Sequence, residues 1–346
     1  MVMQHEVTHP QLLLGKNGRI IEEGWARTPV WNYNRNRVKG SRLLIKEWEY
    51  YAIINQEEGW ASSVTFSDLG YAALFAISYV DLATGAVSQT DAIAPFSLGK
   101  LGLPATSTED HELAWSNKHL RIALVKRGEE RHLMYACPSL EVGDGRIGLD
   151  VDVTLTQSPS LESMTIATSW KEKRHCFYHN EKVNCLPAKG TIRRGSELSR
   201  LAIGSTFGVL DWGRGKWTYK NTWYWASASG TIDQVPIGLN LGYGFTDRSV
   251  ASENVIIYDS KVHKLNTVTF EFTSFMDPWI IKDDGGRLNL TFVPVTDRSS
   301  HFNLVLIASE QHQLFGHYSG TCVLDDNTTI TIDHLAGFAE EVRNRW

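Results

Sequence analysis

The sequence predicts an all-β protein built from two sheet-forming domains in tandem. Short stretches of alternating apolar and polar residues recur along the chain, and turn signals rich in Asp, Asn and Gly separate them. Strongly helical stretches are scarce. The 346 residues exceed what a single small barrel requires, so two barrel-like or sandwich-like domains fit better than one.

The clearest predicted strand is LDVDVTLT, where Leu149, Val151, Val153 and Leu155 share one face and polar residues occupy the other. A strand with this pattern has one face in the core and one in water. Further predicted strands are TVTFEF, RLNLTF, TTITID, HLRIALVK and FNLVLIAS, the last at residues 302–309.

The C-terminal segment LAGFAEEVRNRW has a different pattern. Leu335, Phe338, Ala339 and Val342 lie at helical spacing, which predicts a short C-terminal helix. It is the best helix candidate in the chain.

A domain boundary is predicted near PAKGTIRRGSEL (187–198), which is polar, contains Gly and lacks a strand pattern. We therefore expect one β domain at 1–195 and another at 196–346. A loose repeat supports this organisation, because WEYYAII (48–54) and WYWASAS (223–229) are each followed by a small-residue strand and then an apolar strand.

Composition excludes several classes of protein. The chain is 42% hydrophobic and 21% charged, which is typical of a globular protein with a sizeable core. Its net charge of −5 gives no electrostatic reason to expect nucleic acid as a partner. No segment approaches the roughly 20 apolar residues of a membrane span, so we expect no integral membrane association. The N-terminal segment does not resemble a signal peptide, which predicts a cytoplasmic protein.

No cofactor or metal site is predicted. The four cysteines form no CxxC pair and are expected to be buried free thiols. The spacing of His312 and His317 suits neither one strand face nor a helical metal pair. The sequence also lacks a phosphate-binding loop and a nucleophile elbow.

The stretch DWGRGKWTYKNTWYWASASG (211–230) concentrates aromatic residues beside two charges. In an extended strand Trp223, Trp225, Ser227 and Ser229 share one face, so that face is crowded at one end and open at the other. The rings could simply fill a core, or they could form the wall of a ligand pocket; both interpretations remain open.

Charged groups near these rings are further candidates. Asp211 and Arg214 could form a charge pair that fixes a turn allowed by Gly213 and Gly215, or Arg214 could stack on a neighbouring indole. The following segment GLNLGYGFTDRSVASEN carries polar side chains that either brace one another or face a ligand: Asn240, Asp247, Glu253 and Asn254.

The chain resembles a bacterial family known as a domain of unknown function, DUF2804. The resemblance spans residues 24 to 346. It rests on GWARTPVWNYNR, KEWEYYAI, FYHNEKVNCLPAKG, LDWGRGKWTY, WYWASASG, GLNLGYGF, SEN, HKL, VPVTDR, EQHQLFGHYSG and GFAEEVRNRW. More remotely, the G-x-G and W-x-W arrangement is similar to one in tocopherol cyclase, carotenoid hydratases (hydroxyneurosporene synthases) and survival-factor-like proteins. These resemblances imply two tandem lipocalin-like (calycin) β-barrel domains that handle isoprenoid or lipid-like molecules.

The first functional hypothesis is an acid-catalysed hydratase or cyclase acting on a small apolar molecule. A carboxylic acid in an apolar pocket can protonate a double bond, and aromatic faces can stabilise the resulting cation. The candidate acids are Asp211, Asp247 and Glu253, and the candidate proton relays are His263 and His312. The candidate ligand-binding residues are Arg214, Trp217, Trp223, Trp225, Asn240 and Asn254.

Two other hypotheses use the same residues. A barrel lined by aromatic side chains could bind a lipid or isoprenoid without doing chemistry. Less expected is carbohydrate recognition, which also combines Trp platforms with Asp and Asn. The sequence gives no prediction of oligomeric state.

Overall fold

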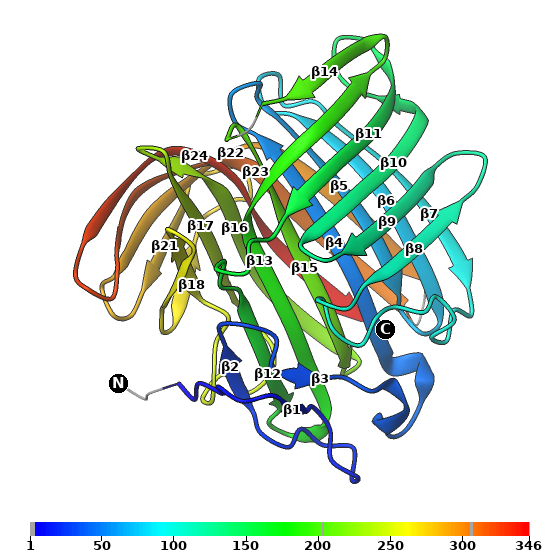
Figure 1. Cartoon of the computed structure of the whole chain (residues 1–346), viewed down its shortest axis with the longest axis vertical. Coiled ribbons are helices and arrows are strands. Elements are labelled where there is room, and N and C mark those ends of the chain that lie inside the picture. The colour runs from blue at the N-terminus through cyan, green and yellow to red at the C-terminus, as the bar shows by residue number, and fades with distance from the viewer. Residues whose placement is uncertain (1–3, 203, 305–306, 346) are drawn as a thin grey trace.

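Two curled antiparallel sheets make up most of the molecule in the computed structural model, which describes residues 4–202, 204–304 and 307–345. Figure 1 shows the two sheets side by side, with the N-terminal segment running below them. The architecture confirms the predicted all-β fold with two lipocalin-like halves. Residues 305–306 of the strand predicted at 302–309 lie outside the described residues.

The first sheet has thirteen strands in the order β7-β6-β5-β4-β15-β13-β11-β10-β9-β8, with β12, β2 and β14 paired alongside β13 or β12. They are β2 (Gly24–Ala26), β4 (Ile45–Asn55), β5 (Trp60–Asp68), β6 (Ala72–Asp81), β7 (Val87–Pro95), β8 (His111–Ser116), β9 (Arg121–Arg127), β10 (Glu130–Glu141), β11 (Ile147–Thr156), β12 (Met164–Trp170), β13 (Lys173–Arg194), β14 (Glu197–Leu201) and β15 (Thr206–Lys216).

The second sheet has nine strands in the order β19-β18-β17-β16-β24-β23-β22-β21-β20. They are β16 (Lys220–Ile232), β17 (Val235–Tyr243), β18 (Val255–Tyr258), β19 (Lys261–Lys264), β20 (Val268–Glu271), β21 (Trp279–Asp283), β22 (Leu288–Leu304), β23 (Ile307–Val323) and β24 (Thr329–Arg345). The N-terminal segment adds β1 (Gln11–Leu12), β3 (Trp31–Asn32) and the 3-10 turns η1 (Arg35–Arg37) and η2 (Arg42–Leu44).

The alternating sequence at Leu149–Thr156 forms β11 as predicted. Its apolar residues Leu149, Val151, Val153 and Leu155 are buried inside the first curled sheet. The intervening side chains point away from that interior. Because the two faces differ in this way, the alternating sequence predicted the strand correctly.

The predicted C-terminal helix is wrong, because residues 329–345 form strand β24. This strand pairs with β16 on one side and β23 on the other. Both faces of β24 are covered between Leu335 and Val342, so the segment carries apolar or small residues without the usual alternation. The resulting apolar spacing resembles that of a helix.

Apolar side chains gather in three places: inside the first sheet, inside the second sheet, and between the two sheets. The contact between the sheets is made mainly by β13, β15 and β4 on one side and β16, β17 and β24 on the other. The chain passes from the first sheet to the second between β15 and β16. The boundary predicted between 195 and 196 falls earlier, between β13 and β14, and stays a prediction.

All four cysteines are buried, and none forms a disulfide among the described residues. The part of the chain that the structure describes contains no helix long and apolar enough to cross a membrane. Within the same ranges, no group of three or more His, Cys, Asp or Glu side chains is arranged to hold a metal ion.

Candidate functional site

The aromatic segment faces the contact between the two sheets. Trp225 packs there against Tyr50 of β4 and Phe338 of β24. The small end of the same face is occupied by β13, because the Asn184 amide donates hydrogen bonds to the hydroxyls of Ser227 and Ser229. The small residues therefore let β13 approach closely, and this end of the face does not leave the opening that the sequence suggested.

Gly213 and Gly215 do not form the turn expected from the sequence. Both lie inside strand β15, and a Cβ at Gly213 would collide with the Trp48 ring. A Cβ at Gly215 would meet the indole of Trp217. The two glycines thus make room for aromatic rings on the face of the sheet.

Trp217 lies at the centre of a cluster of rings. Its ring centroid is 5.1 Å from Phe245, 5.4 Å from Trp223, 5.9 Å from Tyr178 and 5.9 Å from Trp48. These rings touch one another, so they form a continuous apolar wall without a large void between them.

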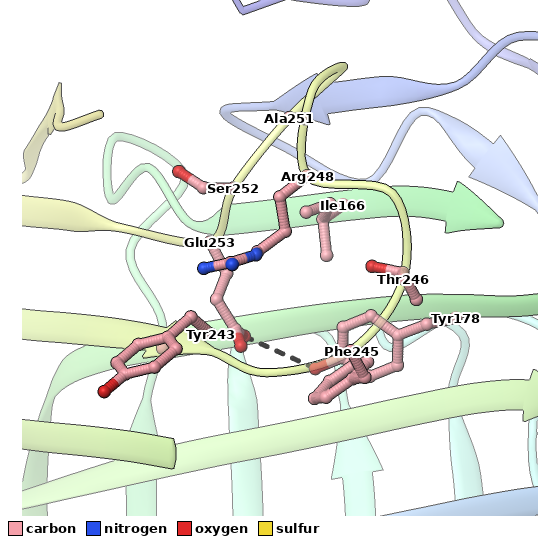
Figure 2. A pocket seen from close by; sticks show the side chains of 10 residues that line it. Ile166, Tyr178, Tyr243, Phe245, Thr246, Arg248, Ala251, Ser252 and Glu253 are labelled. Carbon is pink, nitrogen blue, oxygen red and sulfur yellow. Dashed lines mark hydrogen bonds between the residues drawn. The ribbon is translucent and has the colours of Figure 1, made fainter. Parts of the chain in front are cut away.

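A small pocket borders this wall (Figure 2). Its volume is about 20 Å³, which is room for about one water molecule. The pocket is lined by Ile166, Tyr178, Gly242, Tyr243, Phe245, Thr246, Arg248, Ala251, Ser252 and Glu253. Most of these residues belong to β17 and to the segment that connects it to β18.

Glu253 is the carboxylic acid of this pocket. The Tyr178 hydroxyl donates a hydrogen bond to its Oε2 at 3.4 Å (Figure 2). Burial raises the pKa of Glu253 against the opposing effect of Lys182, and the negative charge of Asp211 raises it further. The raised pKa favours a protonated carboxyl that can donate a proton.

Asp211 forms a buried ion pair beside the pocket. Its Oδ2 lies 2.7 Å from Nζ of Lys182, and the Asn180 amide donates to Oδ1 at 2.6 Å. The Lys182 ammonium also lies 3.6 Å from the ring centroid of Trp225. These contacts pair Asp211 with Lys182 and Asn180, so its carboxyl group is not free to act as the acid of the pocket.

Asn240 and Asn254 position the residues around Glu253. Asn240 accepts a hydrogen bond from the Trp225 indole at 2.8 Å and donates to the carbonyl oxygen of Glu253 at 2.7 Å. Asn254 accepts from the Gly242 amide at 2.7 Å. Both asparagines therefore brace the backbone at the base of the pocket.

Glu340 is a buried carboxylic acid that the sequence analysis missed. It lies on β24 opposite Trp225, and its oxygens accept hydrogen bonds from the Trp223 indole at 3.0 Å and the Gln313 amide at 2.9 Å. Burial raises the pKa of Glu340 to about 7. Because the sequence predicted a helix here, it did not predict that β24 pairs with β16 and brings Glu340 next to Trp225.

Three predicted catalytic residues lie elsewhere. The Asp247 carboxylate pairs with Arg174 at 3.2 Å, and hydrogen bonds from Ser249 lower the pKa of Asp247. His263 pairs with Asp325 at 3.3 Å. His312 lies 2.6 Å from Asp297 and stacks on Phe275. His263 and His312 therefore neither line the pocket nor belong to the ring cluster around Trp217.

Arg214 lies on the opposite face of β15 from Asp211, so the predicted Asp211–Arg214 pair is not formed. Its guanidinium lies 4.0 Å from the Trp212 ring, which confirms the alternative of stacking on a neighbouring indole. It also donates to the carbonyl oxygens of Pro104 and Trp48. Arg214 is fully buried and braces backbone on the inner side of the first sheet.

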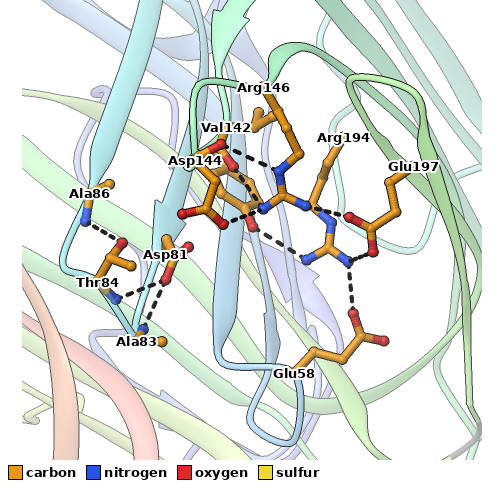
Figure 3. Close-up of polar contacts among 12 residues, drawn as sticks. Glu58, Asp81, Ala83, Thr84, Ala86, Val142, Asp144, Arg146, Arg194 and Glu197 are labelled. Atoms are coloured by element: carbon orange, nitrogen blue, oxygen red, sulfur yellow. Dashed lines mark hydrogen bonds and ion pairs between the residues drawn. The ribbon is translucent and has the colours of Figure 1, made fainter.

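A separate polar network lies around the end of β13 (Figure 3). Arg194 pairs with Glu58 at 3.1 Å and with Glu197 at 3.4 Å. Arg146 pairs with Asp144 at 3.6 Å in the same network. These contacts join the β4–β5 turn to β14, and none of these side chains lines the pocket.

Comparisons place the chain in a family and a fold. The sequence matches the family described as Domain of unknown function (DUF2804) over residues 4–346. The fold is similar to that of a candidate AttH protein from Nitrosomonas europaea, with a TM-score of 0.54, 10% identity, and 91% of this chain and 98% of that chain covered. It is also similar to kievitone hydratase from Nectria haematococca, with a TM-score of 0.52, 10% identity, and 100% and 98% covered. No curated protein gives a significant sequence match. At these identities, the structural likeness establishes the fold alone.

Proposed function

This chain belongs to the DUF2804 family, and on that premise we propose that it protonates a small unsaturated apolar molecule held between its two sheets. The observation that carries the proposal is Glu253, a buried carboxylic acid with a raised pKa that borders a pocket beside an aromatic wall. The fold similarity to a protein named as a hydratase is consistent with this reaction class.

In the proposed reaction, the Glu253 carboxylic acid transfers its proton to one carbon of a double bond, and the π electrons form the new C–H bond. The other carbon becomes a carbocation, which the faces of Tyr178 and Phe245 stabilise. In a hydratase, a water oxygen bonds to the cation and its surplus proton returns to the Glu253 carboxylate. In a cyclase, a hydroxyl group of the same molecule adds instead, and its proton restores Glu253.

Substrate entry requires the segment from Gly244 to Asn254 to move, because the pocket has room for about one water molecule. This segment carries Phe245 and Glu253. It is held against the first sheet by the Arg174–Asp247 ion pair and by the hydrogen bond from the Asp247 amide to the carbonyl oxygen of Ser169. We assign Asp247 to this bracing role.

The test compares turnover of prenylated quinols and polyenes by the full chain and by Glu253→Gln. We expect product formation by the wild-type protein and a loss of about 100-fold or more in the variant, because Gln cannot donate a carboxylic proton. Glu130→Gln is the matched control, since Glu130 is exposed and pairs with Lys189 away from the pocket. Equal turnover by wild type and Glu253→Gln would remove Glu253 as the acid.

Native mass spectrometry of freshly purified protein tests the alternative of binding without chemistry. An intact co-purified lipid that is not converted over time would identify a binding protein. A ligand whose mass increases by one water, or whose mass is unchanged but whose double-bond count falls, supports the proposed hydratase or cyclase.

A further inference from the structure

Arg248 lies at the rim of the pocket described above. Figure 2 shows its side chain reaching across the pocket above Tyr243, on the side where Glu253 lies. The guanidinium carbon is 5.4 Å from the centroid of the Tyr243 ring. This cation–π contact orients the guanidinium but leaves its N–H donors available.

The neighbouring cations already have partners. Arg174 pairs with Glu23 and Asp247, at 2.6 Å and 3.2 Å. Lys264 donates to the Ser252 hydroxyl and to the carbonyl oxygens of Asn254 and Leu265 at about 3 Å. Within residues 4–202, 204–304 and 307–345, Arg248 forms no ion pair. The pocket therefore has an accessible cationic group on one side.

Arg248 is exposed, whereas the buried part of the pocket has the reverse character. Glu253 and the nearby Asp211 are buried carboxyl groups, and the rings of Tyr178, Tyr243 and Phe245 line the pocket beside Glu253. An anionic group directed inward would meet these carboxyls, whereas an apolar group would meet aromatic surface. The charge pattern thus fixes one orientation for an amphipathic ligand.

We propose that the ligand of this pocket is an amphipathic anion, whose carboxylate or phosphate head is bound by Arg248 and whose unsaturated apolar part points toward Glu253. A guanidinium binds such heads through two parallel N–H···O hydrogen bonds. The inference rests on the proposed function for the position of the site and adds the class of substrate. Binding of the head by Arg248 would place the double bond at the acid.

The test measures binding of fluorescent cis-parinaric acid and of its methyl ester, which has the same chain without the charge. A second pair, farnesyl phosphate and farnesol, distinguishes a phosphate head from a carboxylate head by competition. The proteins are the full chain, Arg248→Gln and the control Arg193→Gln. Arg193 is exposed on β13 of the first sheet and does not line the pocket.

We expect Arg248→Gln to weaken binding of at least one anionic probe by about tenfold, with little change for its neutral counterpart. Arg193→Gln should bind like the wild type. Equal weakening of charged and neutral probes, no weakening of either, or no binding of any probe by the wild type would overturn the inference. A selective loss in Arg248→Gln together with unchanged turnover in Glu253→Gln would retain the head-group site and reject the acid.

Discussion

Glu49 and Glu253 are both buried glutamates, but they lie in two differently built regions. Glu49, on β4 inside the first sheet, is 3.1 Å from the His111 imidazole and accepts a hydrogen bond from Tyr51 at 3.0 Å. Glu253, between the sheets, has the Tyr178 hydroxyl at 3.4 Å. Burial opposes ionisation of Glu49, yet the contact with His111 lowers its pKa, whereas burial raises the pKa of Glu253.

Burial alone therefore does not decide the role of a carboxyl group. Because the contact with His111 lowers the pKa of Glu49, its ionised form is favoured and it is a poor proton donor. Glu181 is a different case. Burial raises its pKa, but the hydroxyl groups of Ser107 and Ser163 donate hydrogen bonds to its carboxylate oxygens. Glu253 combines a raised pKa with a pocket, and this combination distinguishes it.

The largest expected effect comes from breaking the ion pair beside Glu253. Asp211→Asn leaves the Lys182 ammonium buried without its charged partner, so we expect the free energy of unfolding to fall by about 3–5 kcal/mol. Urea unfolding followed by tryptophan fluorescence measures this change. The double variant with Lys182→Met should recover much of the loss; a change below about 1 kcal/mol in Asp211→Asn would show that the pair contributes little.

The next effect is the pH dependence of the free energy of unfolding, which differs between Glu340, between the two sheets, and Glu49, inside the first sheet. Native Glu340 keeps its proton up to about pH 7, whereas an ordinary glutamate releases it near 4.5. Between these values the native state binds more protons than the unfolded state, so the free energy of unfolding falls as pH rises, by roughly 3 kcal/mol. Glu340→Gln should remove this fall in urea unfolding at pH 5 and pH 8. An unchanged difference between the two pH values would contradict the assignment.

For Glu49 the sign is opposite. Its lowered pKa contributes stability above the unfolded pKa, and this contribution is lost as pH falls through the folded pKa. At pH 7 we expect Glu49→Gln to lower the free energy of unfolding by about 1–3 kcal/mol, because His111 and Tyr51 lose a charged partner. Glu253→Gln, which resembles the neutral acid, should cost less than about 1 kcal/mol. A larger cost for Glu253→Gln than for Glu49→Gln would contradict the different roles assigned to the two glutamates.

The smallest effect on the free energy of unfolding concerns the hydrogen bond from Trp225 to Asn240, the residue that in turn binds the carbonyl oxygen of Glu253. Trp225→Phe keeps a ring under Lys182 but removes the indole N–H that donates to Asn240. We expect a loss of about 1 kcal/mol in the free energy of unfolding. Trp212→Phe, on β15 of the first sheet, is the control, because the Trp212 indole nitrogen has no hydrogen-bond partner in the described structure. A cost in Trp212→Phe that matches Trp225→Phe would mean that lost ring volume, not the hydrogen bond, is measured.

The sequence predicted strands well where one face meets water. Alternation identified β11, because its apolar side chains enter the core while Asp150 and Asp152 do not. It failed at β24, where both faces are covered and alternation disappears. A strand buried on both faces carries too little periodic signal to distinguish it from a helix of similar length.

The candidate site was predicted in part. Local spacing placed Trp223 and Trp225 on one face, and Glu253 was among the candidate acids. Lys182 and Glu340 were missed because their approach to these tryptophans depends on packing of the two sheets and on the pairing of β16 with β24. Such long-range contacts leave no local pattern.

Asp247 and Glu253 could not be distinguished from the sequence, because both are carboxylates of one glycine-containing segment. The fold separates them: Asp247 pairs with Arg174 on the side of the first sheet, whereas Glu253 enters the pocket.

Infrared spectroscopy asks whether the buried Glu253, whose pKa is raised, holds a proton in the folded protein. The difference spectrum between wild type and Glu253→Gln is recorded at pH 7 on the full chain. We predict loss of the C=O stretch of a protonated carboxylic acid in the variant. Loss of a carboxylate band in its place would mean that Glu253 is ionised, and it would contradict the account.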